Sequence, residues 1–346
     1  MRRALKLILP ALTLVLLLSA VSWGEVVKVQ LNRKKKNLRP GGSFQLELMT
    51  EPDGASASWS SSDETVAVVN QNGLVTGLHE GTADITAKLG KKSAVCRITV
   101  VLRGYCLIDG DHYYYLKDGS LAKGRWVKLD GIWKWFQENG KEIVPSKAIA
   151  FTFDDGPTGN TARVLEILKA YGCGATFFQC GYEVAGQAEL EPKIWENGCE
   201  IGNHSWDHPY LGRVSADTIR SQVSRTNAVI LKFSGKSPAL LRPPYGSVSS
   251  TLRSSAKMPL ILWSITDEGL YAHSGMMTAN AILRNPQDGD IALMHDLHPW
   301  CIETIRYAIP RLIQRGFQIV SVSKLAEIQG VTLKNGTEYH TIRKGS

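Results

Sequence analysis

Short apolar runs alternate with stretches of helical periodicity from Pro145 to Val322, and this pattern restricts the fold more than any other feature of the sequence. Apolar runs bounded by amphipathic stretches are typical of buried parallel strands joined by helices. The amphipathic stretches predict helices at residues 161–171, 215–233 (after the N-cap Ser215) and 301–315. The apolar runs predict strands at residues 148–153, 175–180, 200–202, 239–241, 259–265, 291–294 and 319–322.

Four of the predicted strands lead into a charged or titratable side chain. These side chains are Asp154 with its neighbour Asp155, His204, Arg242 and His295. Because the carboxyl ends of the strands in a βα barrel lie on one face, we expect the side chains to converge there. The sequence therefore predicts a functional site on that face.

A metal site is predicted within this group. His204 and His208 are four positions apart, so both imidazoles can face one point if the segment turns helically. Such a pair alone is more often coincidental than a pair of ligands, but Asp155 supplies a third ligand. Two nitrogens, one oxygen and an open position for water are the composition of a catalytic zinc site.

The carboxylate doublet has a structural alternative, an acidic turn that Gly156 and Pro157 would support. Adjacent side chains at a strand end point in different directions, so Asp155 can bind a metal while Asp154 stays free as a general base. Arg242 is the available charge to orient this base, and a purely structural ion pair is the alternative for it.

Residues 25–103 show a different pattern, in which apolar and polar residues alternate with period two between turn residues. This alternation predicts a small antiparallel β-sandwich. The order of the segments 59–62, 66–69, 73–77 and 81–87 resembles the bacterial immunoglobulin-like group 2 domain. The resemblance implies a surface-exposed spacer or adhesion module without a catalytic group.

Residues 104–144 contain an internal repeat, since Gly110 and Gly131 are 21 positions apart, as are Gly119 and Gly140. The pattern predicts a small unit of aromatic β-hairpins. It resembles the choline-binding type of wall-binding repeat, in which aromatic rings cage a cation or stack on sugar. The alternative is that the aromatic side chains fill a hairpin core and pack on the next domain, because such arrays usually need at least three repeats.

The N-terminal segment 1–24 begins with basic residues, continues as an apolar run and ends in small residues, which is the pattern of a secretory signal peptide. An uncleaved membrane anchor is the alternative, since the run approaches the roughly 20 residues that span a bilayer. A secreted or cell-surface protein is expected in either case. Residues 331–346 are predicted to form a basic, loosely ordered C-terminal tail.

The net charge of +8 would suit an anionic surface such as a wall polymer, but the positive residues are dispersed, and no nucleic-acid binding is expected. Six cysteines in an exported chain permit disulfides, but their spacing is irregular and a chain of this length needs no disulfide framework, so buried thiols are the alternative. No Cys-x-x-Cys pair is present, so a cysteine-rich zinc site is not expected.

The strand-end segments 152–157, 204–208, 242–246 and 293–295 resemble, in order and spacing, the motifs of the polysaccharide deacetylases, the NodB-homology or carbohydrate esterase 4 family. The resemblance spans about residues 146–328. It implies a deformed (β/α) barrel, for which we predict the bounds 145–330. It also implies a divalent metal, Zn²⁺ first and Co²⁺ as the alternative.

The resemblance also implies a role for each site residue. Asp154 would be the catalytic base and His295 the general acid, with Arg242 tuning the base. The metal ligands would be Asp155, His204 and His208. The backbone N–H of Tyr245 would bind the oxyanion, and the expected substrate-binding residues are Leu293 in the acetyl pocket and Trp263.

The fourth family motif differs in this chain. The family places Asp-x-x-Asp-Trp after a Trp-Ser-x strand, whereas this sequence has Thr266, Gly269 and Leu270 at those three positions. Asp267, one position later, is a candidate to reach Arg242. Otherwise Arg242 would be less well held and His295 less well tuned, with reduced activity or a reshaped acetyl pocket.

These observations predict an exported, metal-dependent hydrolase that removes N-acetyl groups from cell-wall amino sugars, with peptidoglycan N-acetylglucosamine as the first candidate. One alternative is a glycan-binding surface protein that has lost turnover, which the altered fourth motif motivates. Another is an O-deacetylase acting on a xylan-like polysaccharide, because ester and amide hydrolysis share this chemistry.

Overall fold

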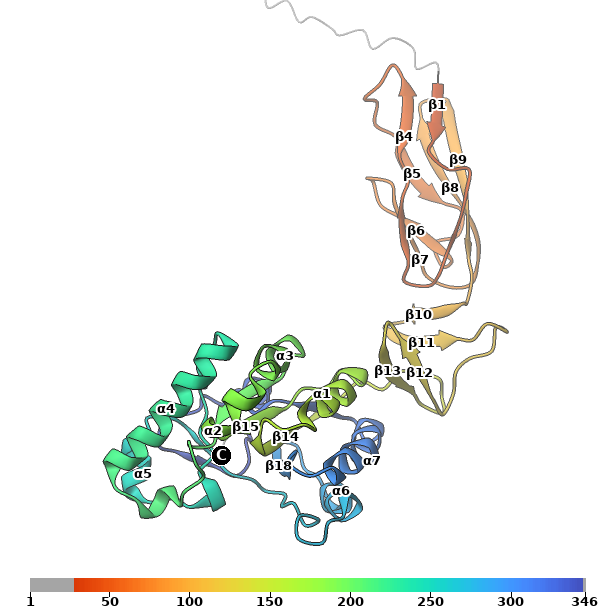
Figure 1. Cartoon of the computed structure of the whole chain (residues 1–346). Coiled ribbons are helices and arrows are strands. Elements are labelled where there is room, and N and C mark those ends of the chain that lie inside the picture. Colours follow the sequence, from red (N-terminus) through yellow and green to blue (C-terminus); the bar gives the residue numbers. More distant parts are fainter. Residues whose placement is uncertain (1–27, 345–346) are drawn as a thin grey trace, which may run out of the picture. The chain divides into compact units, whose positions relative to one another are not determined.

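The computed structural model describes residues 28–344, which form two compact units, one ending at Gly110 and the other beginning at Asp111 (Figure 1). The predicted signal peptide, residues 1–24, lies outside the described residues. Among residues 28–344, none of the helices combines the length and the apolar character that crossing a bilayer requires.

The first unit consists of β-strands. Its four-stranded sheet has the order β2-β9-β8-β5, a three-stranded sheet has the order β3-β7-β6, and β1 pairs with β4. Alternate residues of β8, such as Ala83 and Ile85, are buried, as the period-two pattern predicts. The strands are β1 (Lys28–Leu31), β2 (Lys35–Leu38), β3 (Ser43–Gln45), β4 (Leu48–Glu51), β5 (Ser58–Ser61), β6 (Ala67–Val69), β7 (Leu74–Gly77), β8 (Gly81–Leu89), β9 (Lys92–Val100) and β10 (Gly104–Ile108).

The second unit begins with short antiparallel strands, β11 (Asp111–Tyr115), β12 (Arg125–Leu129) and β13 (Ile132–Phe136). The 21-residue repeat is visible in the backbone, because the isolated bridge from Tyr115 to Leu121 recurs between Phe136 and Glu142. Equivalent residues of the two repeats therefore adopt the same local structure.

The aromatic side chains of this hairpin pack on the next part of the unit. The ring centroids of Trp126 and Trp135 are 5.4 Å apart, and Trp126 also makes an edge contact at 5.5 Å with Tyr171. Tyr171 caps the C-terminus of α1 (Thr161–Ala170). These contacts agree with the alternative prediction for residues 104–144, in which the aromatic side chains fill a hairpin core and pack on the next domain.

A five-stranded parallel sheet forms the centre of the second unit. The strands β16, β15, β14 and β18 are adjacent in this order, and β19 also pairs with β14. Both faces of the sheet are covered, so β14 is buried at seven consecutive positions, from Ala148 to Asp154, and again at Gly156. The strands are β14 (Lys147–Gly156), β15 (Thr176–Gln179), β16 (Glu200–Asn203), β17 (Leu260–Ile261), β18 (Asp290–His295), β19 (Phe317–Val320) and β20 (Glu338–Tyr339).

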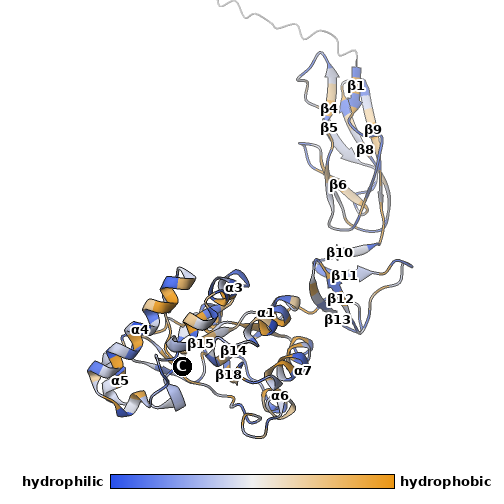
Figure 2. Cartoon of the chain, viewed as in Figure 1, coloured by the Kyte–Doolittle hydropathy of each residue, from blue (hydrophilic) through white to orange (hydrophobic). Residues whose placement is uncertain are grey.

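Amphipathic helices surround this sheet, and in Figure 2 α1 and α4 carry both apolar and polar stretches. The predicted N-cap Ser215 is confirmed, since its side chain accepts a hydrogen bond from the backbone N–H of Thr218. The remaining helices are α2 (Gly181–Val184), α3 (Leu190–Glu196), α4 (Ala216–Ser234), α5 (Ser250–Ser255), α6 (Gly275–Arg284), α7 (Trp300–Gln314) and α8 (Val322–Gln329).

Two predicted strands are mostly absent. Residues 239–241 form no strand, and residues 259–265 form only the two-residue β17, with single parallel bridges at Leu241, Leu260 and Ile265. The carbonyl oxygens of Ile261 and Leu262 instead accept hydrogen bonds from the guanidinium of Arg242. A side chain thus satisfies backbone groups that a strand ladder would otherwise pair.

The prediction of a loosely ordered tail is wrong for residues 331–344. β20 pairs in parallel with β17, and Ile342 is fully buried. The backbone N–H of Ile342 donates to the carbonyl of Gly289 at 2.8 Å, and Arg343 donates to the carboxylate of Asp290 at 2.7 Å. Apolar burial and paired backbone groups therefore hold the tail on the second unit, despite its basic composition.

Candidate active site

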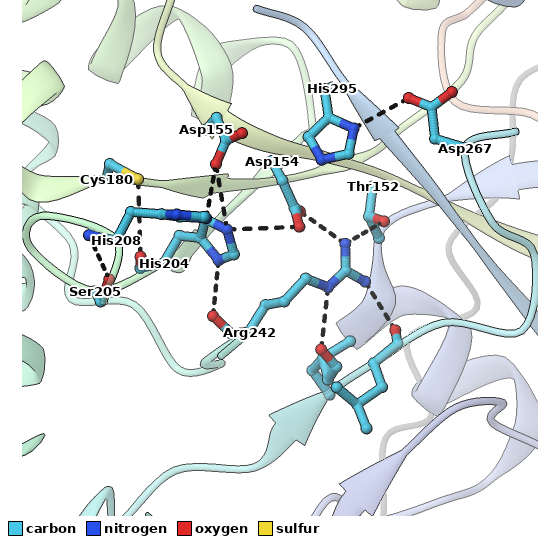
Figure 3. Close-up of polar contacts among 12 residues, drawn as sticks. Thr152, Asp154, Asp155, Cys180, His204, Ser205, His208, Arg242, Asp267 and His295 are labelled. Carbon is cyan, nitrogen blue, oxygen red and sulfur yellow. Dashed lines mark hydrogen bonds and ion pairs between the residues drawn. The ribbon is translucent and has the colours of Figure 1, made fainter. Parts of the chain in front are cut away.

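The three predicted metal ligands meet at one point (Figure 3). Oδ1 of Asp155 lies 3.4 Å from Nε2 of His204 and 3.3 Å from Nε2 of His208, and one ligand atom from each residue lies within 4.8 Å of the others. Oδ1 of Asp155 is buried and has no hydrogen-bond partner. An unpaired carboxylate oxygen facing two imidazole nitrogens is a donor set that fits a divalent cation such as Zn²⁺.

The tautomer of His204 is fixed by the backbone. Its Nδ1 lies 2.7 Å from the carbonyl oxygen of Arg242, which can only accept, so Nδ1 carries the proton. In the neutral form of this imidazole, Nε2 presents its lone pair to Asp155 and His208, as metal binding requires.

The segment between the two histidines does not turn helically, contrary to the expectation. Residues 204–210 contain no helix, with a bend at Trp206 and Asp207, and both Ser205 and His208 have a left-handed backbone conformation, with φ of 65° and 60°. Asp155 also has a positive φ, of 70°. Such conformations cost free energy for residues other than glycine and concentrate at functional sites. The two imidazoles thus converge through two local reversals of the chain.

Neighbouring imidazoles keep the carboxyl group of Asp155 ionised. Burial would raise the pKa of its carboxyl, but the nearby imidazoles of His204, His295 and His208 outweigh burial and lower the pKa to about 2. Burial, together with the neighbouring His204, lowers the pKa of His208. At neutral pH, Asp155 is therefore an anion beside a neutral His208, which are the protonation states of metal ligands.

Asp154 lies between the three ligands and a buried cation. Its Oδ1 accepts a hydrogen bond of 2.8 Å from Nη1 of Arg242, whose side chain is fully buried. Nη1 also donates to Oγ1 of Thr152 at 2.6 Å, so the guanidinium is fixed on both sides. Oδ2 of Asp154 lies 3.7 Å from Nε2 of His204, next to the predicted metal position. Asp154 thus has one oxygen held by Arg242 and the other directed at the metal position.

Asp267 contacts His295 and not Arg242. Its Oδ2 lies 3.0 Å from Nδ1 of His295, and its Oδ1 accepts a hydrogen bond from the hydroxyl of Thr278. Burial lowers the pKa of His295, but the hydrogen bond to Asp267 and the charges of Asp154 and Asp155 raise it overall. Thr266 stands where the family has its first aspartate, but Asp267 still gives the imidazole of His295 a carboxylate partner. Arg242 donates its hydrogen bonds to other groups and not to Asp267.

These residues line one cavity of about 550 Å³, a size typical of small-molecule sites. Every predicted site residue lines it except Arg242, which lies behind Asp154. Asp154 and His295 are register partners on the adjacent strands β14 and β18, so the base and acid candidates face the same cavity. The lining residues are Asp154, Asp155, His204, His208, Tyr245, Trp263, Thr266, Asp267, Leu270, Tyr271, His273, Leu293, His295 and His298.

Sequence reasoning missed a buried carboxyl group beneath the site. Asp296 is fully buried, accepts a hydrogen bond from the hydroxyl of Thr161, and has a second oxygen without a partner. Burial raises the pKa of Asp296 to about 7. A Cβ at Gly156 would approach this oxygen to 2.9 Å, so Asp296 packs against the end of β14 that carries Asp155. In the sequence, the only feature that pointed to Asp296 as part of the site was its position directly after His295.

The six cysteines lie among the described residues, and all are buried free thiols. Cys180 lies near the ligands, since its sulfur is 3.8 Å from the carbonyl oxygen of His204. Burial raises the pKa of the Cys180 thiol far above its ordinary value, so it stays protonated and is a poor metal ligand.

Comparisons with known proteins agree with this geometry. A family profile described as polysaccharide deacetylase matches residues 141–259, and one described as bacterial Ig-like domain (group 2) matches residues 25–100. The peptidoglycan-N-acetylmuramic acid deacetylase PdaC of Bacillus subtilis is 37% identical over 184 residues, which are 53% of this chain and 39% of that protein. The chain thus spans about two fifths of the length of this relative.

Two shorter relatives are covered almost completely. A peptidoglycan-N-acetylglucosamine deacetylase of Bacillus cereus is 32% identical over 52% of this chain and 88% of its own length. The structure of a family 4 acetyl xylan esterase from Clostridium thermocellum in complex with a cobalt ion is 33% identical, with a TM-score of 0.55 at 57% coverage of this chain and 99% of that one. The chain belongs to the polysaccharide deacetylase family.

Proposed function

We propose that this protein is a metal-dependent hydrolase that removes N-acetyl groups from amino sugars of cell-wall glycan, with peptidoglycan N-acetylglucosamine as the first substrate. One observation carries the proposal. Asp155, His204 and His208 form a ligand set, while Asp154, next to it, accepts a hydrogen bond from Arg242 and is not a member of the set. Separate positions for a cation and a base are what hydrolysis by an activated water requires.

The residues take the following roles. Asp155, His204 and His208 would hold the cation, which lowers the pKa of a water and polarises the acetyl carbonyl. Asp154 accepts the proton of that water as its oxygen attacks the carbonyl carbon. The backbone N–H of Tyr245 donates to the tetrahedral oxyanion, a contribution of about 3 to 4 kcal/mol for such donors.

His295 completes the reaction. With Nδ1 directed at Asp267, its other nitrogen is available to protonate the sugar nitrogen as the C–N bond breaks. Acetate and the free amine then leave. Leu293 and Trp263 line the same cavity and would contact the acetyl group and the sugar.

Acetate release tests this proposal. The purified chain should release acetate from N-acetylglucosamine oligomers or peptidoglycan, lose this activity with a chelator, and regain it with Zn²⁺ or Co²⁺. Asp154→Asn should retain the metal and lose roughly 10²- to 10⁴-fold in kcat. Release that a chelator leaves unchanged would contradict the metal role.

An O-deacetylase acting on a xylan-like polysaccharide is the second candidate. It is supported by the similarity to the acetyl xylan esterase, because ester and amide hydrolysis can use the same base, acid and cation. The kcat/KM for acetyl-xylan measured beside that for N-acetylglucosamine oligomers distinguishes the two. The altered fourth motif was the reason to consider a glycan-binding protein without turnover. That reason no longer applies, since His295 has a carboxylate partner in Asp267.

We further propose that the deacetylase domain is a deformed barrel and that the aromatic side chains of residues 104–144 have a packing role. We also propose that the protein is located outside the cell. The single bridges at Leu241, Leu260 and Ile265 link β16 back to β18, which supports barrel closure. The contacts of Trp126 with Trp135 and Tyr171 support packing rather than choline binding. Choline titration of the chain tests the packing role, and fractionation of cells that express it tests the location.

A further inference from the structure

The ring of Tyr245 contacts two other rings. Its centroid is 4.0 Å from that of Tyr210, and the two ring planes are nearly parallel, at an angle of 14°. It is also 4.5 Å from the centroid of His208, in an edge contact at 67°. His208 belongs to the ligand set, and the backbone N–H of Tyr245 is the proposed oxyanion donor. The Tyr245 ring therefore connects these two groups, and Tyr210 packs on that ring.

Tyr210 itself has no part in the proposed mechanism. The described residues that line the cavity include Tyr245 and His208 but not Tyr210. The guanidinium carbon of Arg213 lies 4.7 Å from the centroid of the Tyr210 ring, a cation–π contact that helps to fix this ring. Any effect of Tyr210 on the site therefore passes through the side chain of Tyr245.

The segment that carries Tyr210 packs on the segment that follows Tyr245. Tyr210 directly precedes a short 3₁₀ helix, Leu211–Arg213, whose first residue is fully buried. A Cβ at Gly212 would lie 2.7 Å from Oγ of Ser247 and 3.0 Å from its carbonyl oxygen, so the two segments are in close contact. The ring of Tyr210 is thus carried by a backbone that is anchored beside Tyr245.

The backbone of Tyr245 needs such support. Its φ of 59° and ψ of 13° are left-handed, a conformation that costs free energy for a residue other than glycine and persists only where surrounding contacts hold it. The N–H groups of Gly246 and Ser247 donate to the carbonyls of Pro243 and Pro244, at 3.0 and 3.1 Å. These turn bonds use the N–H groups that follow Tyr245. The ring contacts of Tyr245 add a constraint from its side chain.

We propose that Tyr210 is a positioning residue, whose ring holds the ring of Tyr245 against His208 and so fixes the oxyanion donor and one metal ligand together. The inference rests on the proposed function and deepens it. Tyr210 acts through Tyr245 and not by contact with the reacting atoms.

Turnover and metal binding should both depend on this contact. The N–H of Tyr245 donates to an oxyanion that exists only along the reaction, so a misplaced donor should lower kcat and leave KM near its wild-type value. His208 also has a left-handed backbone, with φ of 60°. Loss of the ring that contacts its imidazole should therefore weaken the affinity for the metal, as the loss of other groups that orient ligands does.

The test is Tyr210→Ala in the full chain. With saturating Zn²⁺ and N-acetylglucosamine oligomers as substrate, kcat for acetate release should fall roughly 10- to 100-fold. The Kd for Zn²⁺, measured by competition with a chelating dye, should rise about tenfold or more. Tyr210→Phe keeps the ring stack and loses only the hydroxyl, so it should restore both values.

The control is Trp133→Ala, which removes an exposed aromatic ring on β13 outside the cavity. It should leave kcat and the Kd for Zn²⁺ at their wild-type values. Wild-type values of both in Tyr210→Ala would overturn the proposal, and with a lower melting temperature they would show that the ring serves only the fold. A failure of Tyr210→Phe to restore them would also overturn it, because the stack would then not be the cause.

The metal titration separates this inference from the proposed function, since it needs no turnover. Weaker Zn²⁺ binding in Tyr210→Ala, with no acetate release by the wild type, would uphold the link from Tyr210 to His208 and contradict the proposed activity. Acetate release by the wild type, with the same kcat and the same Kd for Zn²⁺ in Tyr210→Ala, would uphold the activity and contradict the positioning role.

Discussion

Oδ2 of Asp267 lies 3.0 Å from Nδ1 of His295, which gives the imidazole of the predicted acid a carboxylate partner. In sequence, Asp267 is displaced by one position from the aspartate of the family pattern. The hydroxyl of Thr278 donates to the other oxygen of Asp267, so the carboxylate is held on both sides. The fourth motif is therefore altered in sequence but retains a carboxylate at the imidazole.

Removing this carboxylate should change the pH profile. Asp267 raises the pKa of His295, and the protonated imidazole is the proposed acid, so activity should fall as the pH rises through this pKa. In Asp267→Asn the pKa of His295 should fall, and the alkaline limb of kcat/KM against pH should move to lower pH by about one unit. The same profile for Glu268→Gln, which removes an exposed neighbouring carboxylate, should match the wild type. A limb that stays in place in Asp267→Asn would show that another group limits the rate.

Arg242 should matter for stability as well as for activity. It is fully buried, and its guanidinium bonds Asp154, Thr152 and two backbone carbonyls. Arg242→Met keeps much of the side-chain volume but leaves the carboxylate of Asp154 buried without its cation. Breaking a buried ion pair in this way should lower the free energy of unfolding by about 3 to 5 kcal/mol. Urea unfolding of the metal-free proteins measures this change, and equal midpoints would contradict it.

The sequence predicted the convergence of the site because strand ends follow from periodicity. Asp154 and His295 belong to long apolar runs, and parallel strands place their carboxyl ends together. His204 follows the strand β16 in the same way. Arg242 reaches the site although residues 239–241 form no strand, with only single parallel bridges at Leu241.

Local conformations were less predictable. Two left-handed residues, Ser205 and His208, bring the second imidazole to Asp155, whereas the sequence suggested a helical turn. Periodicity does not reveal such reversals, because residues other than glycine adopt them only when surrounding contacts hold them. The tail was mispredicted for a similar reason, since one buried side chain, Ile342, contributes little to a composition dominated by basic residues.

Metal should stabilise the folded chain. A ligand that binds only the native state stabilises it by about 2.7 kcal/mol at a hundred times its Kd. The melting temperature of the chelator-treated protein should therefore rise with added Zn²⁺ or Co²⁺. Asp155→Asn should abolish most of this rise, because it removes the anionic ligand between His204 and His208. A rise of equal size in Asp155→Asn would indicate that the metal binds elsewhere.

The packing of the C-terminal residues 331–344 on the second unit can be tested without measuring catalysis. Ile342 is fully buried, whereas Ile328 on α8 is 39% exposed. Ile342→Ala should lower the free energy of unfolding by about 2 to 5 kcal/mol, because it removes buried methyl groups and leaves a cavity. The matched change Ile328→Ala should cost less, near the 0.5 kcal/mol usual for surface positions. Denaturant unfolding compares the two, and equal small losses would mean that residues 331–344 contribute nothing to the fold.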